Sequence, residues 1–309
     1  MFTSYNNYTI MATLMKYSAL IGNPTEHSVS PLLFEWIAEQ LPRPIEYRHL
    51  KVDIPQVSEL KTALEAFRAL NFCGLNVTLP YKLDVISILD KVNNSISSIG
   101  AVNTVVFDDK NNQSIGYNTD WYGVYRPLSE MINAHQKQRA IVFGTGGAAR
   151  AAIYALLKLG VEDITVLHRP VESGLTKSLQ NQFSDKVMIR FDTYNHIVQH
   201  IDTANIFINA TSTGMVGQDA KTPFTLDLLK NHENFSRKVF FDCVFNPVNT
   251  PLVSYFKSNG AITIDGLWMM IYQGLYAFTL WTGNDVRDTF TKDSLDDLHG
   301  LLQERIEHA

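Results

Sequence analysis

The stretch RAIVFGTGGAARAAIYALLKLG, residues 139–160, decides the fold. An apolar strand, AIVF, leads into the turn 144–149, and a long helical segment follows. The turn matches G-x-G-x-x-A, in which glycines allow a sharp bend and a close approach of the backbone to a pyrophosphate. The N-terminus of the next helix directs free N–H groups at the phosphates. Glycines also serve plain strand-to-helix turns, but the strand before and the helix after favour a dinucleotide site. Its candidate residues are Gly144, Gly146, Gly147 and Ala148.

The next expected strand, TVLHR, carries the residues that should distinguish NAD from NADP. An NAD site usually has an acidic residue about 20 positions after the loop, whereas an NADP site has a cation near the 2′-phosphate. No Asp or Glu stands at the tip of this strand, which ends in His168 and Arg169. Arg169 offers a planar fork for a phosphate. A surface arginine explains this one feature equally well.

Strand-like and helix-like segments alternate along the rest of the chain. In the first half we expect strands at 17–22, 45–52 and 73–79, helices at 31–41, 57–70, 81–92 and 121–132, and a hairpin over 100–120. In the second half, strands are expected at 205–215, 238–245 and 261–266, followed by an apolar helix around Gln273. This order predicts an α/β fold with a mostly parallel first sheet and a doubly wound nucleotide-binding second half.

Composition limits the classes of function. The chain has 309 residues, 45% of them hydrophobic and 18% charged, which describes a globular protein of two domains. The net charge of −5 gives no basic face for nucleic acid. The apolar stretch 266–283 is interrupted by Gln273 and is too short for a membrane span. Cys73 and Cys243 fit neither a disulfide framework nor a metal site, and the first sixteen residues do not resemble a signal peptide. We therefore expect a cytoplasmic protein.

Two charged residues follow apolar strands. Lys82 comes two residues after Pro80, and Asp120 follows the expected hairpin. Open α/β sheets place their ligand crevice at such strand ends. Taken singly, Lys82 is explained as a solvated charge and Asp120 as a helix N-cap. Taken together, an Asp that holds a Lys supplies the acid–base group that alcohol oxidation requires as hydride leaves. No zinc motif offers an alternative. The residues thus predict an NAD(P)-dependent oxidoreductase of a small polyol or hydroxy acid.

Other polar residues have two explanations each. Ser30 fits an N-cap of the helix that begins with Pro31, whereas Ser28 lies outside that helix, and two hydroxyls near a helix N-terminus also suit a carboxylate. Asn103 stands between apolar residues and suits a turn or strand edge. Gln273 is the polar side chain of an apolar helix, so it either bonds to backbone or faces a wet cleft, and we favour the cleft.

A set of motifs occurs in a fixed order along the chain: GNPTEHSVSP (22–31), GLNVTLPYK (74–82), GAVNT (100–104), GYNTDWYG (116–123), the glycine loop, NATSTGM (209–215), DCVFNPVNTPL (242–252) and DGLWMMIYQG (265–274). With these motifs the chain resembles the shikimate dehydrogenase family over nearly its whole length. The resemblance implies two α/β domains around a deep cleft. Residues 1–119, completed by helices in 266–309, would form the substrate domain, and residues 120–265 the Rossmann-like NADP domain.

The same resemblance implies reversible, NADPH-dependent reduction of 3-dehydroshikimate to shikimate in aromatic amino-acid biosynthesis. Lys82 and Asp120 would be the catalytic pair. The residues implied to contact the substrate are Ser28, Ser30, Asn76, Thr78, Asn103, Phe245 and Gln273. Those implied to contact NADP, besides the glycine loop, are His168, Arg169, Thr211, Ser212, Gly266 and Met269. No metal is implied.

Two positions depart from the family pattern. Phe245 stands where a tyrosine hydroxyl would reach the substrate, and Ser173 stands where a second cation would meet the 2′-phosphate. We therefore expect a moderate preference for NADP. A quinate or dual quinate/shikimate dehydrogenase, and a non-catalytic nucleotide-binding regulator, remain as alternatives. The expected partner is a small-molecule substrate, without nucleic acid or membrane, for a monomer or homodimer.

Overall fold

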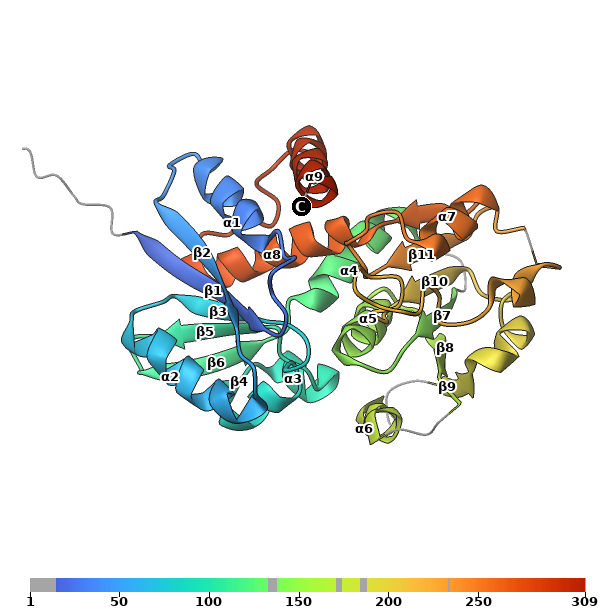
Figure 1. The fold of residues 1–309 in the computed structure, drawn as a ribbon, viewed down its shortest axis with the longest axis horizontal. Helices are drawn as coiled ribbons and strands as arrows, with labels where there is room; N and C mark the ends of the chain where they lie inside the picture. Colours follow the sequence, from blue (N-terminus) through green and yellow to red (C-terminus); the bar gives the residue numbers. More distant parts are fainter. Residues whose placement is uncertain (1–14, 133–137, 171–173, 184–187, 233, 309) are drawn as a thin grey trace, which may run out of the picture.

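The computed structural model describes residues 15–132, 138–170, 174–183, 188–232 and 234–308 (Figure 1). Ser173, the position of the expected second cation, lies outside these residues, as do the first fourteen. The described strands form two sheets of six strands each. Figure 1 shows the two sheets with helices around them and with α4 and α8 between them. Across the described segments, none of the helices combines the length and the apolar character that a bilayer crossing requires.

The first sheet has the strand order β2-β1-β3-β5-β6-β4. Its strands are β1 (Lys16–Gly22), β2 (Tyr47–Asp53), β3 (Gly74–Val77), β4 (Lys91–Val92), β5 (Thr104–Asp108) and β6 (Gln113–Tyr117). β1 pairs in parallel with β2 and β3, whereas β5 is antiparallel to both β3 and β6. The predicted hairpin is therefore present, and it makes this sheet mixed. Around it lie η1 (Val57–Glu59), α2 (Leu60–Ala69) and α3 (Asn94–Ile99).

The prediction of a helix over 81–92 is wrong. Only the short 3-10 helix η2 (Asp84–Ile88) forms there, followed by β4. The carbonyl oxygen of Lys82 accepts a hydrogen bond from the backbone N–H of Val102 at 2.8 Å. That carbonyl is thus used by another segment and is not free for the i+4 donor of an α-helix. Lys82 consequently lies in a turn after β3, not in the first turn of an α-helix.

Ser30 is not an N-cap. Helix α1 (Ser30–Glu39) has Val29 at its N-cap position and Ser30 as its first residue. The backbone N–H of Ser30 donates to the Oγ of Ser28 at 3.2 Å. The side chain that satisfies this exposed end of the helix therefore comes from Ser28, one residue further out than a standard cap.

The second sheet is entirely parallel, with the strand order β12-β11-β10-β7-β8-β9. Its strands are β7 (Arg139–Phe143), β8 (Asp163–His168), β9 (Met188–Thr193), β10 (Ile206–Asn209), β11 (Val239–Asp242) and β12 (Ile262–Ile264). The helices are α5 (Gly147–Lys158), α6 (Gly174–Phe183), η3 (Tyr194–Gln199), η4 (Leu226–Leu229) and α7 (Pro251–Ser258). The order reverses at β7, and ligands of such sheets bind outside the carboxyl ends of the strands at this point. The predicted doubly wound arrangement is confirmed.

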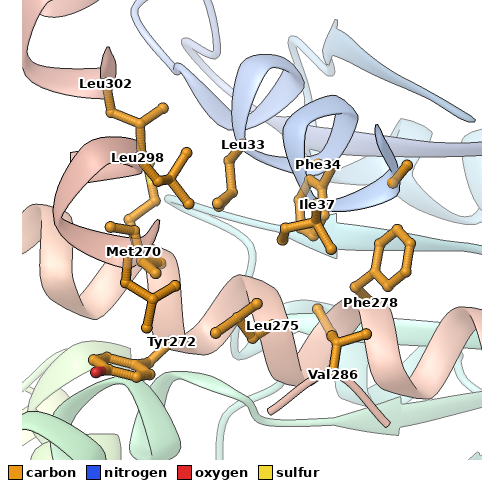
Figure 2. Packing of buried hydrophobic residues seen from close by; sticks show 14 of the residues in the cluster. Leu33, Phe34, Ile37, Met270, Tyr272, Leu275, Phe278, Val286, Leu298 and Leu302 are labelled. Carbon is orange, nitrogen blue, oxygen red and sulfur yellow. The ribbon is translucent and has the colours of Figure 1, made fainter. Parts of the chain in front are cut away.

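Helices α4 (Asp120–Met131) and α8 (Gly266–Thr282) pack closely against each other, and α4 also packs against α5. A Cβ atom at Gly123 would lie only 2.5 Å from the Met269 carbonyl oxygen, so the two helices cross where glycine permits it. In Figure 2, apolar side chains of α8 and of α9 (Lys292–Glu307) face Leu33, Phe34 and Ile37 of α1. The last two helices of the chain thereby complete the core beside the first sheet.

Candidate active site

Lys82 and Asp120 form an ion pair close to the carboxyl ends of the first sheet. The Nζ of Lys82 donates to Oδ2 of Asp120 at 2.5 Å, and the two side chains are only 16% and 6% exposed. Asp120 is the first residue of α4, but Thr119 holds the N-cap position. The Asp120 carboxylate therefore faces the lysine and does not cap the helix. Two opposite charges at such low exposure depend on each other, because either one alone would be an uncompensated buried charge.

Asn103 fixes the second oxygen of Asp120. Its Nδ2 donates to Oδ1 of Asp120 at 2.8 Å, and its Oδ1 accepts the backbone N–H of Thr119 at 2.6 Å. Asn103 is buried at the start of the hairpin, so its amide spans the two hairpin strands and also orients the carboxylate. The strand-edge role foreseen for Asn103 and a place in the site are thus both present. Only one carboxylate oxygen is left to face Lys82.

Gln273, in α8, contacts the polar side chains around Asp120. Its Nε2 donates to the Met270 carbonyl oxygen at 2.9 Å, and its Oε1 accepts from the Thr119 hydroxyl at 3.3 Å. Asn103 Nδ2 also lies 3.3 Å from that oxygen. The amide is half-buried, and it both bonds to backbone and reaches the polar cluster. The backbone bond, one of the two explanations expected from the sequence, is therefore present, while the wet cleft stays a prediction.

Two threonines in this cluster were not singled out from the sequence. Asn76 Nδ2 lies 3.2 Å from the Thr104 hydroxyl, and the Thr104 and Thr119 hydroxyls are 3.0 Å apart. Asn76 and Thr104 are direct partners in the β3/β5 register. Their proximity follows from strand pairing. The sequence does place each threonine next to a candidate site residue: Thr104 follows Asn103 in GAVNT, and Thr119 precedes Asp120 in GYNTD.

The serine pair and Thr78 lie at the neighbouring strand ends. The Ser28 hydroxyl donates to Oγ of Ser30 at 3.1 Å, with Ser28 half-buried and Ser30 buried. Thr78 follows β3 directly, and its methyl group would lie 2.3 Å from a Cβ atom at Gly22, the last residue of β1. Gly22, where the loop that carries both serines begins, is therefore held against Thr78. The structure brings these three hydroxyl residues to one end of the first sheet.

The glycine loop lies beside Lys82. Gly144 has a φ of 105°, a conformation that favours glycine, and a Cβ there would lie 2.9 Å from the Thr211 methyl carbon. Gly146 is the N-cap of α5 and has no side chain to cap it. Among the described residues, no atom apart from those of Gly146 and its chain neighbours lies within 4 Å of a Cβ placed at Gly146. A Cβ at Gly147 would lie 3.2 Å from Cδ of Lys82. Open space and free helix N–H groups fit a pyrophosphate, directly next to the ion pair.

The tip of β8 has an exposed cation. Arg169 is exposed, while the Nδ1 of His168 lies 2.6 Å from the Arg169 carbonyl oxygen. His168 pairs with Thr193 in the β8/β9 register, which brings Tyr194, the next residue, near Arg169. Burial raises the pKa of Tyr194 to about 12, and the nearby Arg169 charge acts in the opposite direction. Tyr194 was not selected from the sequence, because only the strand register places it there.

The loop after β10 lies beside the glycine loop, and the loop after β11 lies near the Lys82–Asp120 ion pair. The hydroxyl of Thr211 donates to Oδ1 of Asn209 at 2.7 Å, and Ser212 is half-buried beside it. Burial raises the pKa of the Cys243 thiol well above its usual value, and the carboxylates of Asp242 and Asp120 add to this. Cys243 therefore lies near the ion pair, a proximity that the sequence did not reveal.

The N-terminal end of α8 packs against the loop that follows β11. A Cβ at Gly266 would lie 2.4 Å from the Val244 carbonyl, so the loop that carries Phe245 packs directly on this helix end. Phe245 is half-buried against the core of Figure 2, and Met269 is buried where α4 and α8 cross. Within the described residues no group of three or more His, Cys, Asp or Glu side chains is placed to hold a metal ion.

Comparison with known proteins now identifies the family. A model of the shikimate dehydrogenase substrate-binding domain matches residues 20–105, a shikimate/quinate 5-dehydrogenase model matches 128–268, and a shikimate 5′-dehydrogenase C-terminal domain model matches 266–287. The chain is 35% identical over 272 residues to a shikimate dehydrogenase (NADP(+)) of Pyrococcus furiosus, covering 87% of this chain and 91% of that one. The chain belongs to the shikimate dehydrogenase family.

Solved structures of shikimate dehydrogenase family proteins share the fold. A shikimate 5-dehydrogenase from Thermus thermophilus, in complex with NADP(H) and shikimate, is 29% identical, with a TM-score of 0.76 over 94% of this chain and all of that one. A quinate dehydrogenase from Corynebacterium glutamicum in complex with NAD is also 29% identical, with a TM-score of 0.74 over 88% of this chain and 95% of that one. The fold expected from the resemblance is thereby confirmed.

The three shikimate dehydrogenase family models divide the site between them. Lys82 and Asn103 fall in the substrate-binding model, the glycine loop and Arg169 in the middle model, and Gln273 in the C-terminal one. Asp120 lies between the first two matched ranges, at the start of the helix that joins the two sheets. The site is therefore assembled from every part of the family architecture.

Proposed function

We propose that this protein is a shikimate dehydrogenase, which catalyses the reversible NADPH-dependent reduction of 3-dehydroshikimate to shikimate in aromatic amino-acid biosynthesis. The observation that carries the proposal is the nearly buried Lys82–Asp120 ion pair directly beside the glycine loop. Family membership and the names of the relatives support it.

Lys82 is proposed as the proton donor. NADPH, when bound, supplies a hydride to the carbonyl carbon of the substrate. The Nζ of Lys82 gives a proton to the carbonyl oxygen as that oxygen becomes a hydroxyl, and solvent then returns a proton to the amine. Asp120 holds the ammonium group in place, and Asn103 keeps the carboxylate oriented. In the oxidation of shikimate the same lysine accepts the hydroxyl proton.

The cofactor is proposed to bind across the carboxyl ends of the second sheet. The backbone N–H groups of Gly146, Gly147 and Ala148 would hold the pyrophosphate, since space is open at Gly146 and these residues form the N-terminus of α5. The N–H of Gly144 already donates to the Leu167 carbonyl oxygen, so Gly144 would instead provide the sharp turn that brings the loop close to the cofactor. Arg169, with His168 beside it, would contact the 2′-phosphate and favour NADP. Thr211 lies against Gly144 of the glycine loop, which supports a contact from Thr211. Contacts from Ser212, Gly266 and Met269 are proposed from the family resemblance.

The substrate is proposed to bind between the ends of the first sheet and α8. Ser28 and Ser30 would hold its carboxylate, because their hydroxyls lie together at the start of α1. The ring and its hydroxyls would be read by Asn76, Thr78, Asn103 and Gln273. Phe245 would contribute an apolar surface without the additional hydrogen bond of a tyrosine.

A turnover assay tests the function. We expect the highest kcat/KM for shikimate with NADP⁺, among the four pairs of shikimate or quinate with NADP⁺ or NAD⁺. Preference for quinate would make the protein a quinate dehydrogenase. Binding of NADPH without turnover of either substrate would indicate a non-catalytic nucleotide-binding protein.

Lys82→Ala tests the role of the lysine. We expect kcat to fall by roughly 10²-fold or more with NADPH affinity nearly unchanged, because general acid–base help is of this size. Lys91→Ala, at an exposed lysine of the same sheet, serves as the control and should keep normal kcat. Normal kcat in Lys82→Ala would rule out the proposed proton transfer.

We also propose a cytoplasmic location, and a monomer or homodimer that requires neither nucleic acid nor membrane. Both cysteines are free thiols, which suits a reducing compartment. Sedimentation of the purified protein determines the oligomeric state, and fractionation of cells determines the compartment.

A further inference from the structure

A buried carboxylate joins the loops that follow β10 and β11. Asp242, the last residue of β11, is fully buried. Its Oδ1 accepts the Nδ2 of Asn209 and the backbone N–H of Val244, both at 2.9 Å, and its Oδ2 accepts the Thr250 hydroxyl at 2.6 Å. Three donors, one from the end of β10 and two from the loop 243–250, thus converge on one side chain. A buried carboxylate is tolerated only when its oxygens are satisfied in this way.

Asn209 extends the connection toward the glycine loop. While its Nδ2 donates to Asp242, its Oδ1 accepts both the N–H and the hydroxyl of Thr211, at 3.2 and 2.7 Å. Thr211 in turn lies against Gly144. The Asp242 carboxylate is therefore two side chains away from the glycine loop.

Thr250 and Val244 extend the connection toward Phe245. Thr250 N-caps α7 and Val244 directly precedes Phe245, so Asp242 holds both ends of the loop 243–250. The two loops also touch directly, since the N–H of Val216 donates to the Asn246 carbonyl at 2.9 Å. Thr250 lies against Gly214, with 3.5 Å between its Cβ and a Cβ placed on that glycine.

We infer that Asp242 is a positioning residue that joins the cofactor-side loop 209–217 to the substrate-side loop 243–250, so that neither loop can shift without the other. The inference rests on the proposed function, which assigns Thr211 to the cofactor and Phe245 to the substrate. Burial raises the pKa of Asp242 to about 6, an effect that its three donors oppose and the nearby Asp265 carboxylate adds to. A carboxylate kept in such a setting is costly in stability, which argues for a role beyond filling the core.

Two reciprocal variants test the connection. Thr250→Val keeps both branches of the side chain, and hence its packing on Gly214, but removes the bond to Asp242 on the substrate side together with the N-cap bond to Val253. Asn209→Ala removes the bonds on the cofactor side. We expect each variant to increase amide hydrogen exchange in both loops, and to raise both the KM for NADP⁺ and the KM for shikimate by roughly 2- to 10-fold. Asp90→Ala is the control, because Asp90 lies in a loop that it ties to Ser114 of β6, a strand of the other sheet.

The outcomes are separable. A merely structural role would lower the thermal midpoint and the fraction of active enzyme while both KM values stay constant. Faster exchange confined to the loop that carries the substitution would overturn the connection. Hydrogen exchange and NADPH titration do not depend on turnover, so they test the inference even if the wild-type protein does not oxidise shikimate. Failure to oxidise shikimate would instead refute the proposed function. Asp242→Ala, if it folds, should show the combined effect.

Discussion

Lys82 uses only part of its bonding capacity. An ammonium group has three donors, and the bond recorded for Lys82 Nζ within the described residues is the one to Asp120. Asp120, by contrast, has both oxygens engaged, by Lys82 and by Asn103. The carboxylate is thus the fixed member of the pair. The lysine retains donors for a ligand oxygen without losing its partner.

Arg169→Ala should separate the two cofactors. The Arg169 side chain is exposed at the tip of β8. We propose that its guanidinium contacts only the 2′-phosphate that distinguishes NADP from NAD. Hydrogen bonds to a charged group are worth about 1.5–3 kcal/mol, so NADPH should bind roughly 10- to 150-fold more weakly while NADH binding stays constant. Titration of both cofactors measures this, with Arg43→Ala, at an exposed arginine beside the other sheet, as the control. An equal loss for both cofactors would refute the assignment.

Phe245→Tyr should tighten substrate binding. A neutral hydrogen bond contributes about 0.5–1.5 kcal/mol, which corresponds to a KM for shikimate roughly 2- to 13-fold lower, with NADP⁺ binding unchanged. Steady-state kinetics of the single variant provides the measurement. A constant or higher KM would mean that the pocket does not accommodate a tyrosine hydroxyl at position 245, and would favour a substrate other than shikimate.

At the scale of elements, the crossing of α4 and α8 should be intolerant of any side chain at Gly123. A methyl group there would overlap the Met269 carbonyl, and overpacking of this kind costs about 1–3 kcal/mol. We expect Gly123→Ala to lower both the thermal midpoint and kcat, because the helices carry Asp120 and Gln273. Gly300→Ala, in α9 with open space around it, should instead stabilise by about 0.5–1 kcal/mol. Thermal unfolding measures the midpoint of both variants. Equal midpoints for Gly123→Ala and Gly300→Ala would show that the two helices are not tightly packed at Gly123.

Elements whose signals are local were predicted well. The strand, glycine turn and helix over 139–160 needed only periodicity and backbone chemistry, and they formed as expected. The helix expected over 81–92 failed because a distant residue, Val102, takes the carbonyl of Lys82. The N-cap at Ser30 failed because the Ser28 hydroxyl takes the first N–H. In both cases a hydrogen bond whose geometry the sequence does not display replaced the local rule.

At the scale of the whole molecule, a buried histidine should make stability depend on pH. Burial lowers the pKa of His49 from 6.5 to about 3. Above pH 6.5 both folded and unfolded chains carry it neutral. Below that, only the unfolded chain takes up a proton, so stability is lost as pH falls toward 3, by up to about 1.4 kcal/mol per pH unit. Asp242 acts oppositely below its raised pKa of about 6, because the folded chain then binds the extra proton.

His49→Gln tests this dependence. Glutamine keeps a polar group for the bond between His49 Nδ1 and Ser18 but does not titrate. Urea unfolding at a series of pH values should show a shallower acid loss in the variant than in wild type, whereas His27→Gln, at an exposed histidine, should leave the slope unchanged. Identical slopes in His49→Gln and wild type would show that His49 is protonated without unfolding.

The site was predictable as far as strand ends could be located. Lys82, Asp120 and the glycine loop follow strands that periodicity reveals. Lys82 and Asp120 come together because β3 and β6 are both antiparallel to β5 and so end at the same edge of the sheet. Thr104 and Thr119 are adjacent because of hairpin register, and Tyr194 meets Arg169 through the β8/β9 register. Register is a long-range property that no single segment encodes. The roles of these residues remain predictions that the experiments above address.

The packing of α1 against α8 and α9 determines when the protein can fold during its synthesis. The second sheet, β7 to β12, is contiguous in sequence, so its strands can pair once residue 264 has emerged from the ribosome. The core around Leu33 and Phe34 must wait for Leu275, Leu298 and Leu302 at the far end of the chain. Until α9 has been synthesised, the part of α1 that packs on α8 and α9 stays uncovered, and exposed apolar surface of this kind makes a nascent chain prone to aggregation.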